Sequence, residues 1–136
     1  MKKAFLDTNI LIRYLTNDDP AKAERVSRLL EEAAAGRLVL VTAEIVVAEM
    51  VWVLESSYGL GTAEIAPLVR GILATPGLEV VNGDLVTRAL ELYEGCNVDF
   101  VDGYIAALME KRRIGDLYSF DKKHASRFRS VRRREP

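Results

Sequence analysis

Two patterns of apolar residues alternate along this chain. Short apolar runs of the kind found in buried strands occur at 3–7, 37–42, 78–82 and 116–120, with a candidate for a short last strand at 127–133. Apolar residues at helical spacing predict helices over 8–16, 18–36, 42–59, 62–74, 83–95 and 99–115. Strands that alternate with helices predict an α/β fold with a central, mostly parallel sheet of four to five strands and helices on both faces.

Residues at the ends of these segments suggest how the helices begin and stop. Asp18 or Asp19 is expected to cap the second helix, which has Pro20 in its first turn. Thr42 and Thr62 each open the tetrapeptide TAEI, and each is expected to act as an N-cap with a glutamate in the first turn. Gly36 and Gly115 are expected to end the helices that precede them.

Length and composition favour a single cytoplasmic domain. The chain has 136 residues, which suits one core, and we expect one domain over 1–136. No apolar run approaches the roughly 18 residues that span a bilayer, so no membrane partner is expected. The opening "MKKAFLDTN" lacks the apolar segment of a secretory signal. Cys96 is the single cysteine and forms no internal disulfide, which fits a reducing cytoplasm.

The net charge of −1 hides a basic C-terminal segment. Residues 122–136 hold seven Lys or Arg and one acid, whereas residues 1–121 hold twelve Lys or Arg and nineteen acids. Such a segment suggests contact with an anionic partner, such as nucleic acid. A solvated tail that keeps the protein in solution is an equal alternative.

Four aspartates fall at strand ends or helix starts. Asp7 follows the first strand and Asp121 the fourth, while Asp99 and Asp102 open the helix before that fourth strand. Ligands of an open parallel sheet bind beyond the carboxyl ends of its strands, so all four could lie at one edge. Each also has a simpler explanation as a helix cap, and Asp99 with Asp102 has the i, i+3 spacing of a capping pair.

Glu49 is harder to explain, because it lies in the middle of the apolar run "IVVAEMVWVL". A buried carboxylate without a partner costs several kcal/mol of folding free energy. Either Glu49 faces water, for which the run offers little polar surface, or a cation inside the protein needs it. Several converging carboxylates repel one another unless a cation neutralises them, and Mg²⁺ or Mn²⁺ prefers such hard oxygen ligands. We therefore expect Glu49 to be buried and to join Asp7, Asp102 and Asp121 around a metal ion.

Four motifs resemble those of the PIN-domain ribonucleases, most closely the VapC-type toxins of toxin–antitoxin pairs. They are "FLDTNILIRYL", "VVAEMVWVL", "DFVDGYIAAL" and "YSFDKKH", in the order and spacing of that family and across nearly the whole chain. Each motif alone is weak evidence for this family, and the four together are strong evidence. The resemblance implies a metal-dependent endoribonuclease that leaves 5′-phosphate and 3′-hydroxyl ends.

The resemblance also implies which residues form the site. Its catalytic and metal-binding acids correspond to Asp7, Glu49, Asp102 and Asp121, and Asp99 matches an acid that is less uniformly essential. Small polar residues beside these acids are expected to hold them, or metal-bound water, in place: Thr8, Asn9 and Ser119. Three cations near the motifs are expected either to contact RNA phosphates or to be merely solvated: Arg13, Lys122 and Lys123.

The family further implies a small VapB-type antitoxin as partner and a homodimer. The helix with Trp52 and the helix from Thr62 are candidate surfaces for these contacts, and core packing is the alternative for both. A PIN-like module that binds RNA or protein without cleavage remains the main competing function. A haloacid-dehalogenase-type phosphotransferase would need an acid at Asn9, and a histidine-based hydrolase would need a nucleophile beside His124.

Overall fold

All five predicted strands form, and they pair in parallel. In this computed structural model, which describes residues 1–136 except the side chain of His124, hydrogen bonds join β1, β2 and β3 in one sheet and β4 with β5 in another. The bounds are β1 Lys3–Phe5, β2 Val39–Ala43, β3 Leu78–Val81, β4 Asp116–Tyr118 and β5 Arg132–Arg134. The expectation about His124 lies outside the described residues.

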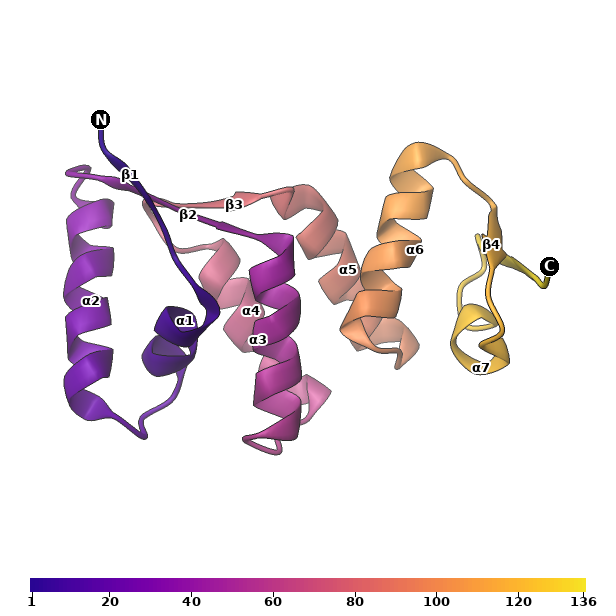
Figure 1. The fold of residues 1–136 in the computed structure, drawn as a ribbon, viewed down its shortest axis with the longest axis horizontal. Coiled ribbons are helices and arrows are strands. Elements are labelled where there is room, and N and C mark those ends of the chain that lie inside the picture. Colours follow the sequence, from indigo (N-terminus) through magenta and orange to yellow (C-terminus); the bar gives the residue numbers. More distant parts are fainter. The chain divides into compact units, whose positions relative to one another are not determined.

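Helices form at each of the six predicted segments, and a four-residue helix follows β4. Their bounds are α1 Thr8–Leu15, α2 Pro20–Ala34, α3 Glu44–Ser56, α4 Thr62–Leu73, α5 Gly83–Cys96, α6 Phe100–Arg112 and α7 Lys122–Ala125. Strands and helices follow one another along the chain as Figure 1 shows. The fold is the predicted α/β class, with parallel strands flanked by helices.

The chain divides into two compact units, Met1–Gly83 and Asp84–Pro136. In the N-terminal unit β2 is the middle strand, with Leu40 opposite Ala4 of β1 and Leu78 of β3. Helix α2 packs against β2 and β3, α4 packs against β3 and α3, and α1 contacts α2 and α3. Apolar side chains with 0 % exposure fill the space between these elements: Leu11, Leu40, Met50, Leu54, Ile65 and Val69.

In the C-terminal unit, the pairing of α5 with α6 forms the core. The ring of Tyr93 meets that of Phe100 edge to face, with centroids 6.0 Å apart and an interplanar angle of 74°. A Cβ on Gly103 would lie 2.9 Å from the carbonyl oxygen of Ala89, so the bare glycine lets α6 approach α5 closely. The core cluster contains Leu85, Leu92, Val98, Ala106, Ala107 and Phe128.

Three of the predicted helix ends differ from the structure. Thr42 is not an N-cap; it is buried in β2, and its hydroxyl donates to the carbonyl oxygen of Leu6 at 3.2 Å, while Ala43 takes the cap position of α3. Thr62 is the first residue of α4, after Gly61 as the cap. Helix α6 ends at Arg113 in a left-handed conformation (φ 57°), before Gly115 is reached. At Thr42 a tertiary hydrogen bond thus overrides the local capping signal.

The basic C-terminal segment is only partly a solvated tail. Its residues 132–134 form β5 alongside β4. Both oxygens of Asp116 are occupied, because Arg132 donates to one at 2.6 Å and Arg134 lies 3.0 Å from the other. The hydrogen bond from Arg132 is the main cause that lowers the pKa of Asp116. Two arginines of this segment therefore stabilise the pairing of β5 with β4.

Gly77, in the turn before β3, is predicted to tolerate no side chain. It has φ +77°, and a Cβ there would lie 2.4 Å from the carbonyl oxygen of Ala33 in α2. We expect Gly77→Ala to lower the free energy of unfolding by about 3 kcal/mol, from left-handed strain and backbone overlap together. Gly36→Ala is the matched control, since Gly36 has φ +81° and open space around it, and should cost about 1 kcal/mol. Equal losses in urea denaturation would contradict the overlap.

Candidate functional site

Asp7 stands at the carboxyl end of β1 and caps α1. Its backbone is extended (φ −82°, ψ 165°), and its Oδ1 accepts a hydrogen bond from the Thr8 amide at 2.7 Å. The capping interpretation is therefore right for this residue. A cap of this kind uses one carboxylate oxygen and leaves the other for a ligand, so capping and metal binding are compatible at Asp7.

Glu49 is exposed, and the expectation that it is buried is wrong. It lies mid-way along α3, and among the described residues its carboxylate makes no hydrogen bond or ion pair. That expectation holds only if other parts of the protein cover the apolar face of the helix. Helix α3 instead exposes Ile45 (75 %) and Trp52 (64 %) on the same face as Glu49. The helix thus carries its acid on an exposed and largely apolar face.

Asp7 and Glu49 line the same cleft of the N-terminal unit. This cleft has a volume of about 410 Å³ and is open to solvent. Its lining residues are Asp7, Thr8, Asn9, Ile12, Arg13, Glu49, Val53, Ser57 and Tyr58. Residues 42 positions apart in the sequence are brought together because α1 and α3 pack against each other. Predicted supporting residues Thr8 and Asn9 lie in the cleft wall as well.

Thr8 carries an unsatisfied polar atom at this cleft. The residue is 6 % exposed, and its Oγ1 is buried without a hydrogen-bond partner among the described residues. A buried hydroxyl without a partner costs roughly 1–3 kcal/mol, so its presence calls for an explanation. A bound ion or its water would supply the missing partner.

The C-terminal unit holds the other predicted acids. Asp102, in the first turn of α6, lines a cleft of about 190 Å³ together with Ser119 and Asp121. The amide of Asp121 donates to Ser119 Oγ at 3.0 Å, and Asp121 Oδ1 accepts from the Lys123 amide at 3.0 Å. Ser119 thus fixes the backbone at Asp121, which is the supporting position predicted for it. Asp121 also caps α7, as Asp7 caps α1.

Asp99 occupies the N-cap position of α6, but its side chain makes no capping hydrogen bond. It is exposed and lines neither of the two clefts that contain the other acids. The capping pair proposed for Asp99 and Asp102 is therefore wrong for the side chain of Asp99, although its backbone begins the helix.

Among the described residues, no three His, Cys, Asp or Glu side chains are gathered closely enough to hold a metal ion. The predicted ligands fall two in the cleft of the N-terminal unit and two in the cleft of the C-terminal unit. Their chemistry fits Mg²⁺ or Mn²⁺, because all are carboxylates with hydroxyl or amide groups beside them. The orphaned Thr8 hydroxyl, beside an acid without a cationic partner, supports that fit.

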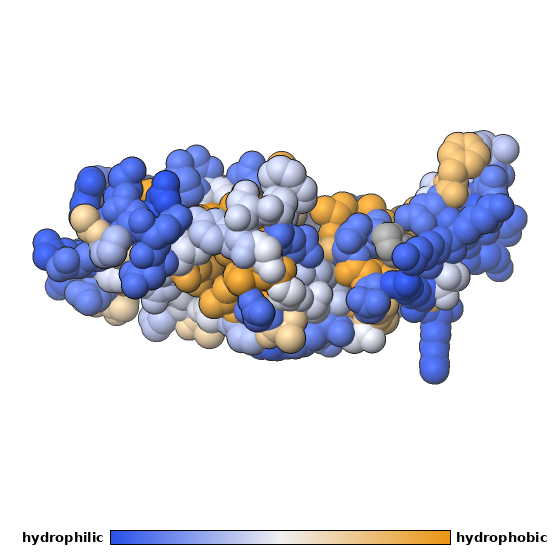
Figure 2. Space-filling view, turned by 90° about the horizontal axis from the view of Figure 1, so that it is seen from below, coloured by the Kyte–Doolittle hydropathy of each residue, from blue (hydrophilic) through white to orange (hydrophobic). Residues whose placement is uncertain are grey.

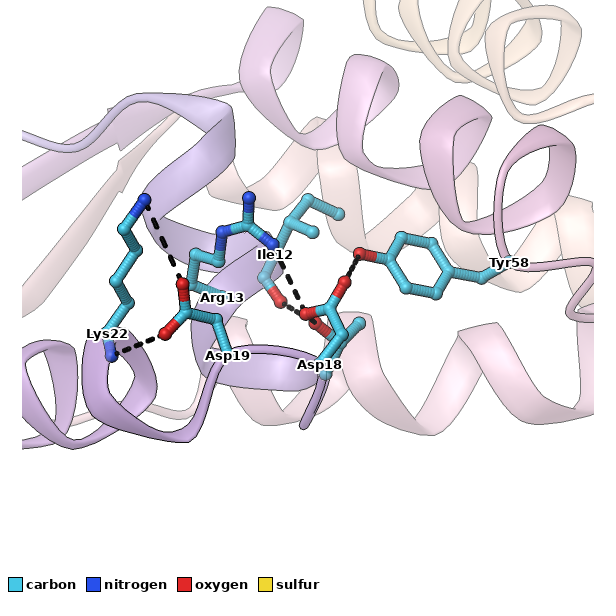
Figure 3. A network of polar contacts seen from close by, with 7 residues as sticks. Ile12, Arg13, Asp18, Asp19, Lys22 and Tyr58 are labelled. Atoms are coloured by element: carbon cyan, nitrogen blue, oxygen red, sulfur yellow. Dashed lines mark hydrogen bonds and ion pairs between the residues drawn. The ribbon is translucent and has the colours of Figure 1, made fainter.

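A polar network that the sequence did not reveal borders the cleft of Asp7 and Glu49 (Figure 3). Asp18 Oδ2 accepts from the Tyr58 hydroxyl at 2.6 Å, and Oδ1 accepts from Thr16 Oγ1 at 2.8 Å and from Arg13 Nη1 at 3.2 Å. These contacts tie the α1–α2 connection to the end of α3. Asp19, and not Asp18, caps α2 by accepting from the Lys22 amide at 3.1 Å. The available signal for this network was the pair of adjacent acids before Pro20. Because one helix needs only one N-cap, the second acid was open to another role.

This chain is similar to known proteins over most of its length. The family model described as the PIN domain matches residues 4–131. This chain belongs to the PIN domain family. The matched residues include all of the predicted acids: Asp7, Glu49, Asp99, Asp102 and Asp121.

Two relatives of this PIN domain are VapC proteins. The chain is 26 % identical over 118 residues to a VapC ribonuclease of Aquifex aeolicus (strain VF5), a match that covers 87 % of each protein. It is 25 % identical to a Mycobacterium tuberculosis VapC toxin of known crystal structure that cleaves the sarcin–ricin loop, with 94 % of this chain and 98 % of that one covered and a TM-score of 0.41.

Several large apolar side chains of this PIN domain reach the surface. Besides Ile45 and Trp52, the exposed ones include Phe5, Val101, Tyr118 and Phe120. Figure 2 shows hydrophobic patches on one face between broad hydrophilic areas. Core packing is therefore wrong for Trp52, whereas the apolar face of α4 is buried through Ile65, Ala66, Val69 and Ile72. No helix in the described chain is long and apolar enough to cross a membrane.

The Asp18 network predicts a specific titration. The hydrogen bond from Tyr58 is the largest cause that lowers the pKa of Asp18 below its ordinary value of 3.8, followed by the bond from Thr16. Tyr58→Phe should raise that pKa toward 3.8, as followed by the carboxyl ¹³C shift of Asp18. Because the folded pKa is the lower one, this stabilisation is complete above pH 3.8 and is lost as the pH falls through the folded value.

Tyr118→Phe serves as the control, since Tyr118 is an exposed tyrosine outside this network. An Asp18 titration that is the same in the Tyr58→Phe and Tyr118→Phe proteins would show that the Tyr58–Asp18 contact does not persist in solution.

Proposed function

We propose that this PIN protein is a Mg²⁺- or Mn²⁺-dependent endoribonuclease and the toxin of a type II toxin–antitoxin system. It hydrolyses RNA phosphodiesters and leaves 5′-phosphate and 3′-hydroxyl ends. Its family membership and its VapC relatives support this assignment. A PIN-like module that binds RNA or protein without cutting it is the alternative.

The observation that carries the proposal is a pair of carboxylates without a cation. Asp7 and Glu49 line one cleft, where the only cationic side chain among the lining residues is Arg13, and Arg13 donates to Asp18 instead. Two carboxylates that share a cleft repel each other, and this repulsion is relieved when a divalent cation joins them. Among the described residues neither carboxylate has a cationic partner, and this favours a role in binding an ion.

The residues proposed to hold Mg²⁺ or Mn²⁺ are Asp7 and Glu49 of the N-terminal unit and Asp102 and Asp121 of the C-terminal unit, with Asp99 as a less central ligand. When bound, the metal ion polarises the phosphodiester and generates a nucleophile from water. Asp7 and Asp121 are each held by a capping hydrogen bond, so their carboxylates are oriented before any ligand arrives. Thr8, Asn9 and Ser119 stand beside them to hold an acid or a water in place.

Glu49 is suited to a different task, since it makes no contact with described residues that would fix it. An exposed carboxylate on a rigid helix can complete the ligand shell or accept a proton from the attacking water. We propose as phosphate contacts Arg13, which lines the same cleft, and Lys122 and Lys123, which begin α7. We assign single-stranded RNA to this site, because sequence-selective RNases act mostly on unpaired regions.

The exposed stripe of α3 supports the predicted protein partners. Ile45 and Trp52 flank Glu49 on one helix face, so a protein that covers these apolar side chains also covers the acid. This geometry suits an antitoxin of the VapB type that masks the cleft. The homodimer remains a further prediction of the same proposal, with α3 and α4 as its candidate helices.

Two other expectations belong to the proposal. The family match over 4–131 extends across both compact units, which supports one PIN domain over 1–136. A cytoplasmic location is still predicted from the single Cys96. The phosphotransferase alternative has lost its basis, since this chain belongs to the PIN domain family.

Glu49→Gln tests the nuclease directly. With antitoxin-free protein, labelled RNA and Mn²⁺ or Mg²⁺, we expect the wild type to cleave and the variant to be at least about 100-fold slower, because the carboxylate charge is lost with little change in shape. Chelation with EDTA should stop the wild type. Glu31→Gln, at an exposed acid on α2, is the matched control and should cleave like the wild type.

Each result has a distinct meaning. If neither the wild type nor Glu49→Gln cuts RNA while both bind it equally, the binding module replaces the nuclease. Cleavage that survives in Glu49→Gln would leave a nuclease whose site does not use this acid.

Thr8→Val separates a functional hydroxyl from a structural one. Because Thr8 Oγ1 has no partner among the described residues, its removal should raise the free energy of unfolding by roughly 1–3 kcal/mol, while cleavage falls about 10-fold. Thr42→Val is the control, since Thr42 Oγ1 donates to Leu6 and its loss should cost about 1–2 kcal/mol without a direct effect on the site. A fully active Thr8→Val protein would exclude Thr8 from holding metal or water.

A further inference from the structure

Arg13 stands where two hollows of the N-terminal unit meet. It lines the cleft that contains Asp7 and Glu49, and it also lines a second hollow of about 480 Å³ between α1 and α2. Asn9 is shared by the two hollows in the same way. The acidic cleft therefore continues into the α1–α2 groove, which we define by the residues Asn9, Ile10, Arg13, Lys22, Arg25, Val26 and Leu29.

The α1–α2 groove has the opposite charge to the cleft. Its lining contains Arg13, Lys22 and Arg25 and no acid. Arg13 donates to Asp18, and Lys22 lies 3.9 Å from Asp19, so both cations are held in place by acids outside the groove lining (Figure 3). In the part of the chain that the structure describes, Arg25 has no acidic partner, and it is exposed.

This difference in charge points to one polyanionic chain that passes from the cleft into the α1–α2 groove. A phosphodiester bound at the acids through a metal ion has further phosphates on either side, and these need cations without competing acids. Arg13 lies about 9 Å along the axis of α1 from Asp7, and the guanidinium of Arg25 lies on the neighbouring helix. The groove floor is Ile10, Val26 and Leu29, with no aromatic ring for base stacking, so it suits the sugar–phosphate backbone.

We propose that the α1–α2 groove binds the phosphates of the RNA strand next to the cleavage point, with Arg25 and Arg13 as the phosphate-binding residues and Asp18 as the positioning residue of Arg13. This inference rests on the proposed ribonuclease function, because it takes the acidic cleft as the place of cleavage. An acidic polypeptide would also satisfy the cations of the groove. The proposed function favours RNA, because a divalent ion at Asp7 and Glu49 would bind a phosphodiester of the same strand whose neighbouring phosphates reach the groove.

The experiment measures RNA affinity without cleavage. A fluorescein-labelled single-stranded oligonucleotide is titrated in Mg²⁺ with protein in the Glu49→Gln background, and anisotropy is followed over a range of salt concentrations. Arg25→Ala should weaken binding about 3- to 10-fold and reduce the slope of log K against log salt by about 0.7, the value for one phosphate contact on a single strand. Arg25→Glu should weaken it further.

Arg28→Ala provides the matched control on the same helix. Arg28 is exposed, pairs with Glu24 at 2.7 Å and does not line the groove, so its loss should leave affinity and salt slope unchanged. Thermal unfolding of all variants should be alike, because both arginines are surface residues.

The outcomes separate this inference from the nuclease itself. Equal RNA affinities of the Arg25→Ala and Arg28→Ala proteins, or no RNA binding by any of them, would overturn the groove assignment even if the wild type cleaves RNA. A wild type that fails to cleave, while Arg25→Ala still loses affinity, would remove the nuclease and keep the groove as an RNA-binding surface. If Arg25→Ala loses affinity for polyglutamate but not for RNA, the groove belongs to an acidic polypeptide and the proposal is wrong.

Discussion

The parallel pairing of β1 with β2 decides where the acids of the N-terminal unit can lie. Parallel strands end at the same edge of a sheet, so Asp7 after β1 and α3 after β2 both start from that edge. The hydroxyl of Thr42 strengthens the pairing at this point by donating to the carbonyl of Leu6, immediately before Asp7. A register slip of one residue would turn Thr42 toward the other face and break this bond. The cleft therefore depends on a register that buried side chains such as Leu40 hold in place.

The sequence predicts the elements of this fold well because their signals are local. Apolar periodicity places each strand and helix, and Pro20 and Gly36 mark the limits of α2 as expected. The caps at Thr42 and Thr62 were predicted wrongly because the same residue type suits a buried strand or a first helical turn. For Thr42 the tertiary hydrogen bond to Leu6 decides the case, whereas Thr62 is the first residue of α4 after Gly61. Asp7 and Glu49, which the sequence predicts to lie close together, line one cleft, and their role there stays a prediction.

The exposure of Glu49 is the most instructive difference. An apolar run around an acid suggested burial, because a helix of a self-sufficient domain normally covers its apolar side chains. In this structure α3 keeps Met50, Val51 and Leu54 in the core and leaves Ile45 and Trp52 exposed. Composition cannot separate apolar residues meant for the core from those meant for a surface. The network of Asp18 and Tyr58 was missed for a related reason, since its members lie 40 positions apart.

The arrangement of ion pairs explains why Asp7 and Glu49 keep no cation. Two cations near the cleft are each held by another acid, Arg13 by Asp18 and Lys22 by Asp19. Without Asp18, the guanidinium of Arg13 would lose the acid that holds it and could turn toward the carboxylates that line the same cleft. Under the proposed function, it would then compete with a divalent ion for those acids. On that proposal Asp18 and Tyr58 act on the cleft indirectly, because they hold a cation at its rim and away from its acids.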